Sequence, residues 1–476
     1  METYNVGAIM ESLMNARFAI GAGILLTFFV GMLQLIALVA GATVYVSMIL
    51  ANVGIIVCGL YLYLGAEEIK ADFPDSYDSD GRWKVHYYSS FAVFAVAVLS
   101  CVVSIFLLPR VRLAVKVLML TGQAVSASPG VVLVPLVTTL LTAVAVLLWV
   151  VVSVFLFSIG DVVPVSVPNV PGGIARTVQF NDTMRHMFVL HFFGILWVMA
   201  ALMALTQMVV GFVGVSWYFA PQEQGKRRIL RCLSFRMLCT VLRYHLGTVA
   251  FGSLLIATVQ FLRAAFEYYM RVVAKHENNP LVKMMACCVR CCLWCIECCL
   301  KFVNKIAYIF VGLTGKSFVP ASCKAIEYIT TNIVRVGVLV VLKAVFLFIG
   351  KLITGAVPAL LVFVWLRTPS VSAFFMPDGP VTDAYLPAVV VFLTGYTVGG
   401  LFASVLDTMS DAILMSYSYN EREKIISHDK DTADSIDSLS KQVEAGEKRG
   451  STVAPEPSVG GAEPAASSSK PEDSEM

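Results

Sequence analysis

The strongest constraint in this sequence is a series of apolar blocks, each near or above the roughly 20 residues that an α-helix needs to cross about 30 Å of hydrocarbon. Hydrophobic residues make up 58% of the 476 positions and charged residues only 14%. A soluble domain has about 45 to 50% and about 25%. The sequence therefore predicts an all-α fold, a polytopic transmembrane helical bundle.

About nine crossings are expected from the apolar blocks. The blocks lie at 18–40, 42–65, 88–108, 131–159, 188–219, 245–270, 331–365 and 385–408, with a short apolar helix at 302–314 and an amphipathic segment after it. The block at 331–365 exceeds a bilayer, so a break at Gly350 and Gly355 is expected. A charged stretch at 66–87 predicts a solvated loop, and the basic stretch from Arg110 predicts an interfacial amphipathic helix.

The distribution of basic residues predicts which side of the membrane each connecting segment faces. The segment 221–243 carries six basic residues and one acid, so the positive-inside rule predicts that it is cytosolic. Counting backwards places 66–87, 160–187 and the N-terminus outside. Asn181, in an Asn-Asp-Thr triplet, is then an outer glycosylation acceptor.

Three regions are expected along the chain: a short N-terminal segment at 1–17, a transmembrane domain at 18–420 and a tail at 421–476. The tail has 13 acids and seven bases among Ser, Ala, Pro and Gly, and it is predicted to be disordered, acidic and cytosolic.

Several function classes lack sequence support. The net charge of +3 lies in short clusters beside apolar blocks, which argues against a nucleic-acid partner. There is no phosphate-binding loop, zinc-protease helix or nucleophile elbow, so no enzyme, metal or cofactor is expected. Seven cysteines within 287–299 favour a juxtamembrane helix with thiols for acylation or packing over a metal site. The side of the membrane for this segment stays open.

The most informative polar residues are Gln260, Arg263 and Glu267, because spacings of three, four and seven place them on one face of an apolar helix. Charges at such depth usually face a bundle interior or a watery cavity and mark a pathway. The alternative is that Arg263 and Glu267 only neutralise each other. Asp407 and Asp411, at the cytosolic end of the last block, are either solvated or part of a gate.

Aromatic residues within the spans suggest a second kind of site. Aromatic faces hold quaternary ammonium ligands through cation–π attraction, although Trp and Tyr also collect at membrane interfaces. Trp197, ten residues before Gln207, is the preferred candidate, and Trp149 is another.

Several stretches together resemble the choline transporter-like proteins, solute carrier family 44. They are CCLWCIECCLKFVNKIAYIFVGLTGKSFVPASCKAI with Tyr308, LWVMAALMALTQMVVGFVGVSWYFA with Trp197 and Gln207, RYHLGTVAFGSLLIATVQFLRAAFEYY, and VLDTMSDAILM with Asp407. The resemblance covers roughly 18–420 and implies a helical carrier for choline or an ethanolamine-like amine. Members typically have an additional first span and a large outer loop, and this sequence starts after them. An outward N-terminus or an incomplete one is the corresponding expectation.

The expected function is transport of an amine cation through the plasma membrane or an organelle membrane. An inside-negative potential contributes about 2.3 kcal/mol per charge per 100 mV, so ion coupling is not required. The expected substrate contacts are Trp197, Gln207, Gln260, Glu267, Trp149 and Tyr308, with Arg263 and Asp407 in gating or structural roles. Discontinuous helices near Gly350 to Gly355 would supply the moving parts.

The alternative function is a membrane scaffold or receptor that recruits partners through its cytosolic tail. Deleting residues 428–476 distinguishes the two, because a carrier should keep transporting without its tail. Oligomeric state is open.

Overall fold

Long helices make up almost all of the chain that is described in a computed structural model. The described residues are 13–39, 42–72, 82–166, 174–223, 226–227, 229–273, 280–331, 333–368 and 384–423. They lie within one unit, 1–430. The expected disordered tail lies outside the described residues, except that its first three positions are helical.

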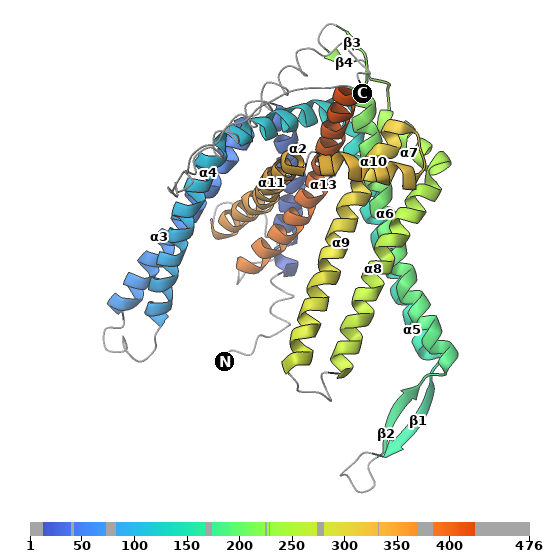
Figure 1. Cartoon of the computed structure of the whole chain (residues 1–476). Coiled ribbons are helices and arrows are strands. Elements are labelled where there is room, and N and C mark those ends of the chain that lie inside the picture. The colour runs from blue at the N-terminus through green and yellow to red at the C-terminus, as the bar shows by residue number, and fades with distance from the viewer. Residues whose placement is uncertain are drawn as a thin grey trace, which may run out of the picture. The chain divides into compact units, whose positions relative to one another are not determined.

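Seven helices in this described part are long and apolar enough to cross a membrane, which confirms an all-α polytopic bundle. They are α2 (Arg17–Val39), α4 (Arg82–Ala127), α5 (Leu133–Ser158), α6 (Asp182–Tyr218), α8 (Leu246–Val273), α11 (Ile333–Arg367) and α13 (Tyr385–Glu423). Two further long helices are α3 (Ala42–Asp72), which packs beside α4, and α9 (Pro280–Thr314), which packs beside α8 (Figure 1). The count of nine crossings stays a prediction.

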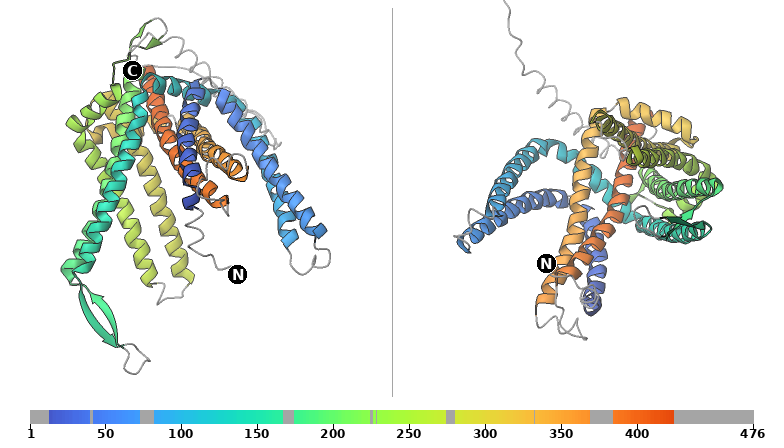
Figure 2. Two further views of the ribbon diagram at one scale, coloured as in Figure 1. Left: turned by 180° about the vertical axis from the view of Figure 1, so that it is seen from behind. Right: turned by 90° about the horizontal axis from the view of Figure 1, so that it is seen from below.

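Two expected segment boundaries near the N-terminus are wrong. Much of the predicted loop at 66–87 is helical, because α3 continues to Asp72 and α4 begins at Arg82. The predicted interfacial helix after Arg110 is not separate but belongs to α4, a 46-residue helix that curves (Figure 2). Charged residues are compatible with a helix. They indicate where lipid ends and do not fix where the helix ends.

Short elements connect the long helices. A 3-10 turn, η1 (Pro129–Val132), leads into α5. Between α5 and α6, β1 (Asp161–Ser166) pairs antiparallel with β2 (Ile174–Gln179), a hairpin that sequence analysis had described only as a loop. The basic segment 221–243 contains a second small hairpin and a helix. These elements are β3 (Gln222–Glu223), β4 (Lys226–Arg227) and α7 (Leu233–Tyr244). The expected amphipathic segment after α9 is α10 (Phe318–Thr331).

The cysteine segment and the short apolar helix expected at 302–314 form one helix, and the position of the cysteines relative to the membrane stays a prediction. Helix α9 runs unbroken for 35 residues and includes both the cysteines and the apolar stretch at 302–314. All seven cysteines are exposed on it. The described residues contain no group of three or more side chains arranged to hold a metal ion. The cysteines therefore lie well inside a long helix that packs beside α6 and α8.

Small residues join α11 to α13. A Cβ atom at Gly395 would lie 2.8 Å from the Cα of Gly355, so the two backbones are in contact there. The expected break of α11 at Gly350 and Gly355 is wrong, because α11 is continuous through both residues and past Pro358. Within lipid a continuous helix keeps its backbone hydrogen bonds satisfied. Gly355 instead allows α11 to pack closely on α13, as membrane helices commonly use glycine.

The most tightly packed part of the bundle lies towards one end. The side chains there are almost entirely buried along three helices, at Met208–Val210 of α6, Ile306–Val311 of α9 and Met409–Ile413 of α13. On α6 this buried stretch leads directly to the basic segment 221–243. Towards their other ends, the same helices separate around a cavity.

Candidate functional site

A cavity of about 1260 Å³ lies between α5, α6, α8, α9 and α13. Its lining extends from Asp407, next to the packed end, to Arg271 and Cys287 near the far ends of α8 and α9. Ligand pockets commonly measure about 300 to 1,000 Å³. The space is therefore ample for a small organic molecule with its water.

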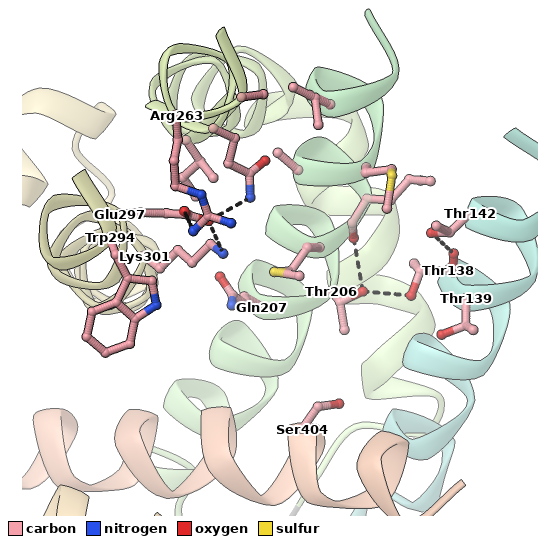
Figure 3. A pocket seen from close by; sticks show the side chains of 18 of the residues that line it. Thr138, Thr139, Thr142, Thr206, Gln207, Arg263, Trp294, Glu297, Lys301 and Ser404 are labelled. Atoms are coloured by element: carbon pink, nitrogen blue, oxygen red, sulfur yellow. Dashed lines mark hydrogen bonds and ion pairs between the residues drawn. The ribbon is translucent and has the colours of Figure 1, made fainter. Parts of the chain in front are cut away.

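Two polar walls face each other across this space (Figure 3). On one side, the hydroxyls of Thr138 on α5 and Thr206 on α6 lie 2.7 Å apart and hydrogen-bond. On the other side, Glu297 of α9 accepts three hydrogen bonds, from Gln260 at 3.1 Å, Arg263 at 2.6 Å and Lys301 at 2.7 Å. Only 6% of the Glu297 side chain is exposed. This Glu297 cluster ties α8 to α9.

A second ion cluster lies nearer the far ends of α8 and α9. Glu267 is 2.8 Å from Arg290 of α9 and 3.7 Å from Arg271 of its own helix. The alternative that Arg263 and Glu267 neutralise each other is therefore wrong. Each of them pairs with a residue of α9 instead.

A third cluster closes the cavity at its packed end and joins α9, α11 and α13. Lys305 lies 2.8 Å from Asp407 and 2.5 Å from Asp411. Lys343 of α11 is 2.8 Å from Asp407 and also contacts Asp411 directly. Sequence analysis named Asp407 and Asp411 but neither of the two lysines. A lysine inside the apolar block of α11 was a usable signal, because such a charge needs a partner within the bundle.

The structure brings five of the predicted residues together at the cavity: Gln207, Gln260, Arg263, Glu267 and Asp407. The other three predicted side chains lie outside its lining. Trp197 donates to the Ala250 carbonyl and to the Ser253 hydroxyl, each at 3.2 Å.

Trp149 stacks on the His191 ring with 5.4 Å between centroids. Tyr308 is fully buried and packs against Gly252, where a Cβ atom would lie 2.3 Å from the phenolic oxygen. The structure thus places all three predicted aromatic contacts in packing positions between helices.

The aromatic side chain that lines the cavity is Trp294 of α9, with 56% of its surface exposed. Sequence analysis missed it because Trp294 lies within the cysteine segment, which was placed outside the spans. Arg290, Trp294 and Glu297 are spaced i, i+4 and i+7, which places them on one face of a helix. This pattern could have indicated that Trp294 shares a face with the charged residues. Asn181 is exposed directly before α6, and its glycosylation stays a prediction.

Comparison with known proteins gives a consistent match. A family model described as plasma-membrane choline transporter matches residues 91–422, a range that contains every residue lining the cavity. Choline transporter-like protein 5-A of Danio rerio is 29% identical over 66% of this chain and 48% of its own length. Choline transporter-like protein 4 of Bos taurus is 28% identical over 84% and 62%, respectively. The chain spans about half the length of the curated relatives it matches.

Proposed function

We propose that this chain, which belongs to the choline transporter-like family, carries choline or a related small amine cation across the plasma membrane. The observation that carries the proposal is a cavity with polar walls inside a polytopic bundle, formed by five helices of the matched region. Membership of a transporter family favours transport over catalysis. Ethanolamine is the first competing substrate to compare with choline.

The membrane topology follows if α3 and α9 also cross. Both have more than the roughly 20 residues needed. Nine alternating crossings then put the basic segment 221–243 and the packed end on one side of the membrane, and the positive-inside rule makes this side the cytosol. The same count places the β1–β2 hairpin and Asn181 outside, where glycosylation is possible. The cavity opens outwards and is closed towards the cytosol.

Trp294 is the proposed contact for the substrate's ammonium group. A methylated nitrogen has no hydrogen to donate, so it is bound through an aromatic face. Gln207 and Gln260 carry amides that can bind the hydroxyl of an amino alcohol. Trp197, Trp149 and Tyr308, which pack between helices, are replaced by Trp294 in this role.

The cluster of Lys305, Lys343, Asp407 and Asp411 is the proposed cytosolic gate. Opening the cavity inwards requires α13 to separate from α9 and α11, which breaks ion pairs joining these three helices. Arg263 has a structural role in this account, since it joins α8 to α9 through Glu297. Membrane potential supplies the driving force for an amine cation.

Uptake of radiolabelled choline into proteoliposomes with an imposed inside-negative potential tests the proposal. We expect saturable uptake by the parent. Trp294→Ala should raise the half-saturating choline concentration about 5- to 30-fold, which corresponds to loss of roughly 1 to 2 kcal/mol of cation–π attraction. Trp294→Phe should retain part of the affinity.

Trp197→Phe is the matched control, because Trp197 lies on the same bundle but outside the cavity lining. It should leave the half-saturating concentration unchanged. Absence of saturable uptake of both choline and ethanolamine by the parent would exclude the proposed function.

A further inference from the structure

The ion clusters on the cavity wall do not balance. Two of them contain one acid and two bases among the described residues: Glu297 with Arg263 and Lys301, and Glu267 with Arg271 and Arg290. The gate cluster has two acids and two bases and is neutral. The three clusters together thus carry two excess positive charges, although the proposed substrate is itself a cation.

Burial directs the excess charge of the Glu297 cluster into the cavity. The carboxylate is 6% exposed, whereas Arg263 and Lys301 expose 44% and 39% of their side chains. Both basic side chains line the cavity, and Gln207 of α6 lies beside them (Figure 3). Arg271, in the other cluster, is 77% exposed. Water screens that outer charge more strongly. The excess positive charge therefore acts on a ligand in the cavity mainly at the Glu297 cluster.

We propose that the cavity binds a small inorganic anion, of the size of chloride or phosphate, at Arg263 and Lys301, and that this anion and the transported amine bind together. The second half of this inference rests on the proposed function. Arg263 bonds Glu297 through Nη1, and a guanidinium carries further donors in the same plane. Charge-assisted hydrogen bonds from Arg and Lys are the strong interactions for such an anion.

The anion has a defined role in this scheme. A cation that enters a cavity with excess positive charge is repelled, and the repulsion is stronger in a low-dielectric surrounding than in water. A bound anion cancels one of those charges and becomes an attractive neighbour for the ammonium group. Anion and amine should therefore each raise the affinity for the other.

Thermal unfolding of the purified full chain, without choline, tests the anion site independently of transport. Sodium chloride or sodium phosphate is titrated against sodium gluconate at constant ionic strength. We expect the parent's unfolding temperature to rise saturably with chloride or phosphate, because a ligand of the native state stabilises it. Arg263→Lys keeps the charge and should keep this response, whereas Arg263→Gln should lose it.

The readout is the change in unfolding temperature as the anion is added, not the unfolding temperature itself. A destabilised variant therefore still gives an answer. Arg185→Gln, on an exposed side chain outside the cavity, is the charge-matched control and should respond as the parent does. A parent without a saturable response, or an Arg263→Gln variant that responds as the parent does, would overturn the anion site.

Choline uptake tests the coupling. Replacing chloride by gluconate should raise the half-saturating choline concentration about 5- to 150-fold, the range typical of coupled binding, and Arg263→Gln should remove this dependence. An equal half-saturating choline concentration in chloride and in gluconate for the parent would overturn the coupling while leaving choline transport intact. Chloride stabilisation without any choline uptake would instead support the anion site and count against the proposed function.

Discussion

Several ion pairs in this bundle join different helices. Arg263 bonds Glu297, Glu267 bonds Arg290, and Lys343 bonds Asp411, each across two helices. A buried charge is costly unless a partner and hydrogen bonds compensate it. Each pair therefore also fixes how its two helices lie against each other.

The gate cluster should be sensitive to the loss of one carboxylate. Asp411→Ala leaves two lysines with one aspartate, an uncompensated charge among buried groups. We expect a loss of about 3 to 5 kcal/mol of folding free energy. Thermal or denaturant unfolding of the purified protein measures it.

The double variant Lys343→Met with Asp411→Leu is the matched comparison. It keeps Lys305 paired with Asp407 and restores neutrality, so it should be clearly more stable than Asp411→Ala. If the two variants are equally unstable, charge compensation does not explain the cluster.

The sequence predicted one wall of the site but not its partners. Gln260, Arg263 and Glu267 share a helical face by spacing alone, and all three line the cavity. Their partners Glu297 and Arg290 lie in the cysteine segment, which sequence analysis interpreted as a juxtamembrane helix and not as a span. Pairing between helices removes the cost of those charges, and this is visible only once both helices are placed.

At the scale of elements, the α11–α13 contact is a close approach of two backbones that small residues allow. The small-residue spacing of Gly395 and Gly399 predicts tight packing, and the structure confirms it: Cβ atoms there would lie 2.8 Å from the Gly355 Cα and 3.0 Å from the Thr354 Cβ. A helix approached so closely has no room for a methyl group.

Gly395→Ala should therefore force α13 away from α11. The expected cost is about 1 to 3 kcal/mol, typical of overpacking, and it is measured by unfolding of the purified protein. Gly400→Ala on the same helix is the control, because a Cβ atom at Gly400 meets nothing within 4 Å. It should be neutral or slightly stabilising, since Ala is the better helix former. Equal destabilisation by both changes would show that the close contact is unimportant.

The existence of the long helices was predictable, but their lengths were not. Apolar blocks identify the part of a helix in lipid, and α3, α4 and α9 all extend beyond or across charged stretches. The β1–β2 hairpin gave no clear pattern because its segment is short and rich in proline. Pairing between the two strands, not the propensity of either one alone, forms this hairpin.

At the scale of the whole bundle, packing is asymmetric. The stretches at Met208–Val210 and Ile306–Val311 are buried at one end, and the cavity separates the same helices at the other. Under the proposed function, with the basic segment in the cytosol, this arrangement corresponds to the outward-open state of a carrier. Alternating access then requires the packed end to loosen while α8 and α9 close over the cavity.

The central claim is that the amine travels through this cavity, and Cys291 offers a direct test because it lines the cavity from α9. In a variant that keeps Cys291 and replaces the other cysteines by Ser, an impermeant thiol reagent is applied to intact cells. The matched variant keeps Cys292 instead, which is exposed but outside the lining. The measurement is the labelling rate with and without saturating choline. The account predicts that choline slows labelling of Cys291 severalfold and leaves Cys292 unchanged, and an unchanged rate at Cys291 would contradict it.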